Sequence, residues 1–99
     1  MSRYPLVISP AAREDLIEIH RFGRLTWGDL RSGEYLQRLK ERFWSLTELP
    51  HIGIARSDLL PGIRSAPVSS HVIFYRFEDG CVEVVRVLHR RQDAQRHLL

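Results

Sequence analysis

The sequence predicts a single small α+β domain, in which a short N-terminal strand and two antiparallel helices pack on an antiparallel sheet. Three observations predict this fold class. Up to Pro50 the apolar residues recur every three or four positions, as they do in helices that bury one face. After Ile63 the chain is rich in β-branched and aromatic residues, and the pair Asp79-Gly80 separates the last two apolar runs. With 99 residues, the chain has room for one domain only, spanning residues 1–99.

The N-terminal half begins with a predicted strand over residues 4–8, which a helix follows. Ser9 is a favoured N-cap and Pro10 fits the first helical turn, so the helix should begin there. It should end before Gly28, and a second helix is predicted from about residue 30 to residue 49. Because the connection is short, the two helices should form an antiparallel hairpin.

The C-terminal half is predicted to hold three strands after a loop over residues 51–62. The strands should cover residues 63–67, 70–77 and 81–89, which gives the element order β-α-α-β-β-β. A two-residue turn at Asp79-Gly80 predicts a register with these facing pairs: Glu78 and Cys81, Arg76 and Glu83, Phe74 and Val85, and Val72 and Val87. This register is favoured because it places opposite charges, those of Arg76 and Glu83, directly across from one another.

Both faces of this last strand pair are largely apolar. The helical hairpin can cover only one of them, and monomeric proteins rarely leave a large apolar face open to water. We therefore expect a partner chain to cover the second face. The alternative is that the C-terminal segment folds back over it.

The cations are concentrated at the C-terminal end. The net charge is +3, and Lys40 is the only lysine, so nearly all cations are arginines, which suit carboxylate and phosphate recognition. From Arg86 onward the chain holds four arginines and a single acid, Asp93. This end favours an acidic partner, either nucleic acid or an acidic protein segment, although a solvated tail would have the same composition.

Cysteine content and hydropathy indicate the cellular compartment in which the protein works. Cys81 is the only cysteine, so no intrachain disulfide or cysteine-based zinc site can form. The apolar run at residues 6–8 is too short for a signal peptide, and no stretch approaches the ~20 apolar residues that span a bilayer. We expect a cytoplasmic protein that does not enter the membrane.

The common catalytic and cofactor motifs are absent. The five histidines show no metal-ligand spacing, and the glycines form no phosphate-binding loop, so we predict no metal site and no cofactor. A triad of Ser69 or Ser70 with His71 and Asp93 is conceivable, but no nucleophile motif supports it and we reject it.

The remaining candidates for a functional site are basic residues with an aromatic neighbour: Arg64, Tyr75, Arg86, His89, Arg90 and Arg91. Arg86 interrupts a run of valines in a predicted interior strand, where an unpaired charge would be costly. Alternatively, Arg86 is a structural residue whose aliphatic stem packs in the fold while its guanidinium group reaches solvent. The group suits the docking of an acidic peptide, or a metal-free RNA-cleaving site in which His89 is the acid or base.

These segments resemble the ParE toxins of the RelE/ParE superfamily. The likeness runs from Tyr4 over nearly the whole chain. Its most specific parts are Ser70-His71-Val72-Ile73-Phe74-Tyr75-Arg76 and Arg86-Val87-Leu88-His89-Arg90-Arg91-Gln92-Asp93. The resemblance implies a RelE/ParE-like β-α-α-β-β-β fold and a role as the toxin of a type II toxin–antitoxin pair. It also implies that a ParD-type antitoxin wraps around the toxin and covers its exposed sheet face, and that DNA is contacted only through the antitoxin.

ParE toxins with a known target poison DNA gyrase and are not regarded as catalysts. The sister branch, RelE, consists of ribosome-dependent mRNA endonucleases that often carry a tyrosine shortly after the last strand, and residues 90–97 hold none. We therefore expect a gyrase-binding toxin without catalytic residues, which contacts its target or antitoxin through the six residues named above. The alternatives are a RelE-like mRNA endonuclease and a basic binding module without toxicity.

Overall fold

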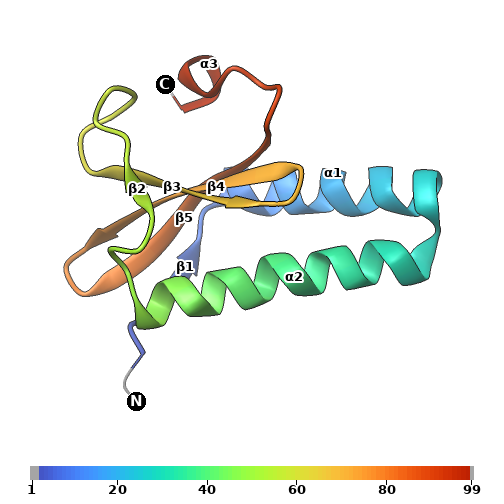
Figure 1. Ribbon diagram of the computed structural model, residues 1–99, viewed down its shortest axis with the longest axis horizontal. Helices are drawn as coiled ribbons and strands as arrows, with labels where there is room; N and C mark the ends of the chain where they lie inside the picture. Colours follow the sequence, from blue (N-terminus) through green and yellow to red (C-terminus); the bar gives the residue numbers. More distant parts are fainter. Residues whose placement is uncertain (1–2, 99) are drawn as a thin grey trace.

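The computed structural model describes residues 3–98 and confirms the predicted fold class (Figure 1). Its elements, in chain order, are β1 (Leu6–Ile8), α1 (Pro10–Trp27), α2 (Asp29–Glu48), β2 (Ile54–Ala55), β3 (Ile63–Val68), β4 (His71–Glu78), β5 (Cys81–His89) and α3 (Ala94–Leu98). The short β2 lies inside the segment that was predicted to be a loop. The five-residue α3 is a second element that the sequence pattern did not predict.

The five strands form one mixed sheet in the order β1-β5-β4-β3-β2. β1 pairs with β5 in parallel, and all the other neighbours are antiparallel. The first strand can run parallel to the last because the helical hairpin and the later strands separate them in the chain. The sheet is therefore antiparallel except at its β1 edge.

The predicted register of β4 and β5 is confirmed near the turn and wrong beyond it. Glu78 faces Cys81, and Arg76 faces Glu83 with an ion pair of 3.5 Å. A β-bulge at Val85 then shifts the pairing, so that Phe74 faces Arg86. The shift carries on along the strands, and Val72 faces Leu88 where Val87 was predicted. An extra residue in one strand of a pair changes which side chains share a face, and strict alternation cannot show it.

The main core lies between the helical hairpin and one face of the sheet. From the helices, Ala12, Leu39, Phe43 and Leu46 pack against the sheet residues Ile73, Tyr75, Val82, Val84 and Val87. The start of α1 is fixed to the sheet by Ser9, whose Oγ accepts a hydrogen bond from the Ala12 N–H at 3.0 Å and donates one to the Val85 carbonyl at 2.8 Å. Ser9, the predicted N-cap residue, thus also bonds the start of α1 to β5.

The second apolar face of the sheet is covered by the chain itself, and our preference for a partner chain there was wrong. Ile63, Phe74 and Leu88 are almost fully buried on this side. The side chains that cover them come from the loop before β3 (Leu59 and Leu60) and from α3 (Ala94 and Leu98). In Figure 1, α3 lies on the side of the sheet away from α2. The alternative, in which the C-terminal segment folds back, is the one that the structure adopts.

The helical hairpin extends well past the end of the sheet (Figure 1). Four large apolar side chains at this distal end, which we call the tip, are exposed to solvent: Phe22, Leu25, Trp27 and Leu30. Among them, Leu25 is 82% and Leu30 78% exposed. Within residues 3–98, no helix is long and apolar enough to cross a membrane.

Candidate functional site

A groove lies where the distal half of the helical hairpin passes the end of the sheet. It encloses about 380 Å³ and is lined by Glu18, Ile19, Phe22, Trp27, Tyr35, Ser70, His71 and His89. Helices α1 and α2 supply its aromatic wall, and the ends of β4 and β5 supply the two imidazoles. We call it the sheet-side groove.

The polar side of this groove is a connected row of three rings. The Tyr35 hydroxyl lies 2.5 Å from His71 Nδ1 and also donates to the Val68 carbonyl at 3.3 Å. His71 faces His89 across the β4–β5 pair, and the two rings meet edge to face at 5.3 Å between centroids. The His89 Nδ1 accepts a hydrogen bond from the Arg91 backbone N–H at 3.1 Å. In the neutral ring the proton of His89 is therefore on Nε2.

Burial shifts the pKa values of Tyr35 and His71 in this row. Desolvation, helped by the neighbouring His89, lowers the pKa of His71 to about 4. Burial also raises the pKa of Tyr35 above its ordinary value. His71 is therefore neutral near pH 7, and neither Tyr35 nor His71 brings a charge to the groove.

Arg90 and Arg91, two of the predicted contact residues, follow His89 at the mouth of this groove. Both side chains are exposed. Their backbone is held in a tight turn, because the Arg90 N–H donates to the Ser70 carbonyl at 3.0 Å and the His89 N–H donates to Gln92 Oε1 at 2.7 Å. Two solvated guanidinium groups thus project from a fixed turn beside an apolar groove.

Arg86 forms a partly buried ion pair with Asp15. Its Nε and one terminal nitrogen donate to the two carboxylate oxygens of Asp15 at 2.7 and 2.8 Å. This contact raises the pKa of Arg86 above its ordinary value. Asp15 also accepts from the Val87 N–H at 2.9 Å, and Arg86 donates to the His97 carbonyl at 3.0 Å. Arg86 therefore connects α1, β5 and α3, and its head does not simply reach solvent.

Tyr75 and Arg64 face each other on β4 and β3, away from the groove. Tyr75 is fully buried, and its hydroxyl accepts from the Gly53 N–H at 2.9 Å and donates to the Pro50 carbonyl at 2.8 Å. Arg64 donates to the carbonyls of His51 and Gly53. Both residues hold the segment after α2 against the sheet.

The structure brings together only part of the predicted site. His89, Arg90 and Arg91 lie at one end of the sheet, whereas Arg64 lies opposite a residue four positions further along β4, roughly 13 Å away at the rise of a strand. Sequence reasoning missed Tyr35, His71, Phe22 and Trp27 as lining residues. The sequence did contain a signal for this groove. Ser70-His71 stands at the start of one strand, and the β4–β5 register pairs that start with the end of the next strand, where His89 lies.

This arrangement is suited to holding another molecule. The groove combines aromatic walls with a basic mouth, a pattern typical of binding surfaces for apolar side chains in an acidic segment. Arg64, Arg86 and His89 do not converge on one point where a reacting atom could lie. In the described part of the chain, His, Cys, Asp and Glu form no group of three or more placed to hold a metal ion.

Comparison with known proteins places the chain among toxins. Residues 6–94 match the family model described as "ParE toxin of type II toxin-antitoxin system, parDE". Toxin ParE1 of Mycobacterium tuberculosis is 39% identical over 98 residues, which covers 98% of each chain. Toxin ParE1 of Caulobacter vibrioides is 33% identical over 94 residues, covering 95% of this chain and 97% of the relative.

A solved structure shows the same fold at lower sequence identity. A chain of the chromosomal ParDE toxin–antitoxin system of P. aeruginosa superposes with a TM-score of 0.77 and 18% identity. The match covers 88% of this chain and 96% of that chain. At this identity the likeness establishes the fold alone.

Proposed function

The chain belongs to the ParE toxin family of type II toxin–antitoxin systems, and on this premise we propose that it arrests growth by binding DNA gyrase. A ParD-like antitoxin neutralises it in a hetero-oligomeric complex. The toxin acts in the cytoplasm, without a cofactor, and meets DNA only indirectly through the antitoxin.

The observation that carries a binding role is the state of Arg86. A catalytic arginine must be free to meet a substrate, but this one is held by both oxygens of Asp15 and by the His97 carbonyl. Arg64 is likewise held by backbone carbonyls. Two of the basic residues that an RNA-cleaving site would use, Arg64 and Arg86, are therefore occupied in the fold itself, which favours a toxin that acts without catalysis.

The contact surface that we propose is the mouth of the sheet-side groove. His89, Arg90 and Arg91 from the predicted set form it together with Trp27, which is 47% exposed. An aromatic side chain beside solvated arginines is the composition found at the energetic centre of many protein interfaces. Arg86 supports this surface by holding α1, β5 and α3 together, whereas Arg64 and Tyr75 hold the segment after α2 against the sheet.

Replacement of the exposed arginines tests this surface. We expect the double variant Arg90→Ala/Arg91→Ala to weaken binding to gyrase or to the antitoxin by at least about tenfold. It should keep the wild-type circular dichroism spectrum, because both side chains are exposed. Arg13→Ala, an exposed arginine near the start of α1, is the matched control and should bind as the wild type does.

Unchanged affinity of the double variant for both partners would contradict the proposed surface. The cellular phenotype decides between the two branches of the superfamily. Inhibited DNA replication with a DNA-damage response supports gyrase as the target, whereas an early stop of translation with cleaved messages supports the endonuclease.

A further inference from the structure

The sheet-side groove adjoins a smaller hollow on α2. This hollow encloses about 120 Å³ and is lined by Trp27, Arg31, Glu34, Tyr35 and Arg38. Trp27 and Tyr35 also line the sheet-side groove, so the two spaces share an aromatic wall. We call the smaller space the basic hollow.

The cations around the basic hollow are not neutralised by the fold. In the described part of the chain, none of the ion pairs involves Arg31, Arg38 or Arg90. Burial raises the pKa of the Tyr35 hydroxyl, and the positive charges of Arg38 and Arg90 act on the same group in the opposite direction. Both charges are therefore felt at the shared aromatic wall. These three cations against the single carboxylate of Glu34 leave a net charge of +2.

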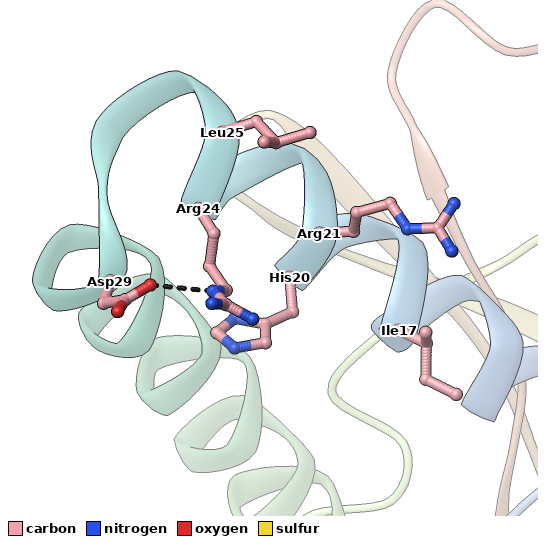
Figure 2. A pocket seen from close by; sticks show the side chains of 6 residues that line it. All are labelled: Ile17, His20, Arg21, Arg24, Leu25 and Asp29. Atoms are coloured by element: carbon pink, nitrogen blue, oxygen red, sulfur yellow. Dashed lines mark hydrogen bonds and ion pairs between the residues drawn. The ribbon is translucent and has the colours of Figure 1, made fainter.

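A larger hollow between α1 and α2, shown in Figure 2, differs in this respect. It encloses about 590 Å³ and is lined by Ile17, His20, Arg21, Arg24, Leu25 and Asp29. Arg24 Nε donates to Asp29 at 2.7 Å, which is the dashed contact in Figure 2. Arg21 is paired with Glu18 at 3.4 Å. The arginines of this hollow are thus compensated within the chain, whereas those of the basic hollow are available to an anion.

The sheet-side groove itself suits a planar ring. Phe22 and Trp27 meet edge to face with 5.9 Å between ring centroids, and both side chains are partly open to solvent. His71 lines the same groove as a ring that is neutral near pH 7. Aromatic faces of this kind stack on nucleobases of any type. The groove volume of about 380 Å³ lies in the range of small-molecule sites.

We propose that the sheet-side groove and the basic hollow together bind a free mononucleotide, with the base in the groove and the phosphate in the hollow. The base stacks on Trp27, and the phosphate meets the guanidinium groups of Arg38 and Arg90. The planar fork of arginine matches pairs of phosphate oxygens, so no glycine loop is needed to hold the phosphate.

The nucleotide is a competing ligand and not a cofactor. It occupies the groove whose mouth is the proposed contact surface for gyrase or the antitoxin, so its binding weakens that contact. In this regulatory part the proposal rests on the proposed function.

The acids near the two spaces favour a single nucleotide over a nucleic-acid strand. Glu18 lines the sheet-side groove and Glu34 lines the basic hollow. In a strand, further phosphates would extend from both sides of the bound nucleotide, and these carboxylates would repel them. A free mononucleotide has its only charge at the end that lies in the basic hollow.

Calorimetric titration of the purified toxin tests the site with adenosine 5′-monophosphate (AMP) as the probe. We expect saturable binding that weakens with added salt, because the phosphate contacts are electrostatic. Adenosine, which lacks the phosphate, should bind at least about tenfold more weakly. Absence of AMP binding up to millimolar concentrations would overturn the proposal. So would inorganic phosphate that competes as well as AMP does, because the base would then contribute nothing.

Two variants with matched controls locate the binding. Trp27→Ala and Arg38→Ala should each weaken AMP binding by at least about tenfold. Trp44→Ala removes a tryptophan that is 46% exposed, against 47% for Trp27, and should bind AMP as the wild type does. Arg21→Ala, at the hollow of Figure 2, should also leave binding unchanged. Equal losses in Arg21→Ala and Arg38→Ala would show attraction to net charge alone and would contradict the site.

A single-stranded oligonucleotide distinguishes the two sources of the same chemistry. Deoxyadenosine oligomers of about ten nucleotides cover the usual site size of a strand-binding protein. They should bind no more tightly than AMP. Affinity more than about tenfold higher than that of AMP would make the ligand a strand and would overturn the proposal of a free mononucleotide.

Competition separates this proposal from the proposed function. At ten times its dissociation constant, AMP should weaken the apparent affinity of the toxin for gyrase about tenfold in the absence of ATP, whereas adenosine at the same concentration should not. Unchanged gyrase binding by the AMP-bound toxin would overturn the regulatory part of the proposal. If the toxin binds no gyrase at all, the proposed function fails, while the calorimetric titrations still decide whether the nucleotide site exists.

Discussion

At the scale of single residues, the clearest feature is the ion pair of Asp15 and Arg86. It joins residues 71 positions apart in the sequence, and Asp15 also supplies the hydrogen bond that β5 would otherwise take from a neighbouring strand at Val87. The side chains are only 12% and 21% exposed, respectively, so solvent screens the pair weakly. This ion pair explains why an arginine can interrupt the valines of an interior strand.

We expect Asp15→Ala to lower the free energy of unfolding by about 2 to 4 kcal/mol, because it leaves a half-buried guanidinium and a backbone N–H without partners. Urea denaturation measures this loss. The double variant Asp15→Ala/Arg86→Met should recover part of it, since no unpaired charge remains. A loss below about 0.5 kcal/mol for Asp15→Ala would mean that the pair is no stronger than one on the surface.

His71 gives a second residue-scale prediction, on the pH dependence of stability. Its pKa in the fold is about 4, below its ordinary value of 6.5, so the unfolded chain takes up the proton first as the pH falls. The stability that comes from a neutral His71 is complete above about pH 6.5 and is lost as the pH falls toward about 4. The variant His71→Gln should therefore show a flatter fall of stability over this window in chemical denaturation.

The matched control is His97→Gln, because this histidine is exposed on α3. It should keep the pH dependence of the wild type between pH 6.5 and 4. An unchanged profile in His71→Gln would show that the burial of this ring does not contribute to the acid sensitivity.

Much of the site could not be read from residue types alone. The sequence identified His89, Arg90 and Arg91 as a basic end, but the role of Arg86 depended on Asp15, an acid far away in the sequence. Tyr75 was one of several aromatic residues, and only the position of Gly53 shows that its hydroxyl is used inside the fold. Such roles depend on contacts between residues that are distant in the sequence, and local sequence patterns do not predict these contacts.

At the scale of elements, the helical hairpin depends on a close approach of α1 and α2. Gly23 and Gly33 lie in the interiors of the two helices, yet their surroundings differ. A Cβ on Gly23 would lie 2.5 Å from Ser32 Oγ, whereas a Cβ on Gly33 would meet nothing within 4 Å. The same substitution should therefore have opposite effects at the two positions.

We expect Gly33→Ala to raise the free energy of unfolding by about 0.5 to 1 kcal/mol, because alanine is the better helix former. Gly23→Ala should lower it by about 1 to 3 kcal/mol, because the added methyl forces the helices apart. Thermal denaturation of the two variants measures both signs. A gain in stability from Gly23→Ala would show that Ser32 moves aside freely and that the contact is not close.

The elements were predicted well where a local signal exists. Ser9-Pro10, Gly28 and Pro50 bound the helices, and Asp79-Gly80 fixes the last turn, so these boundaries agree with the structure to within about two residues. The register failed at Val85 because a β-bulge leaves no mark in the alternation of apolar residues. The two-residue β2 is too short to carry a pattern.

At the scale of the whole molecule, the sheet is covered on both faces by its own chain, and a group of exposed apolar side chains lies at the hairpin tip. Leu98 of α3 packs over Ile63, Phe74 and Leu88. Composition suggested an uncovered sheet face, but a short C-terminal helix was enough to close it. This cover was not predictable, because residues 94–98 are too few to show a helical period.

The cover supplied by α3 can be tested with two matched variants. Leu98→Asp should lower the melting temperature by several degrees and increase the binding of a hydrophobic dye, because it opens the second face of the sheet. Gln95→Asp, an exposed position on the same helix, should change neither. Equal effects of the two substitutions would mean that α3 does not shield the sheet.

The surface left open for partners is thus the sheet-side groove and the hairpin tip, with the basic turn at Arg90 and Arg91 beside the groove. A partner on this surface would account for exposed side chains such as Leu25 and Leu30, which would be a liability in a protein that works alone.

The central claim is that this toxin acts by binding gyrase, and a supercoiling assay with purified components tests it most directly. Added to gyrase and relaxed plasmid, the wild-type protein should inhibit supercoiling and trap cleaved DNA–gyrase complexes at a near-stoichiometric ratio, and Arg90→Ala/Arg91→Ala should do so less. Two results together would contradict the claim: full supercoiling activity of gyrase at a large excess of folded toxin, and cutting of ribosome-bound mRNA when the same toxin is added to a cell extract.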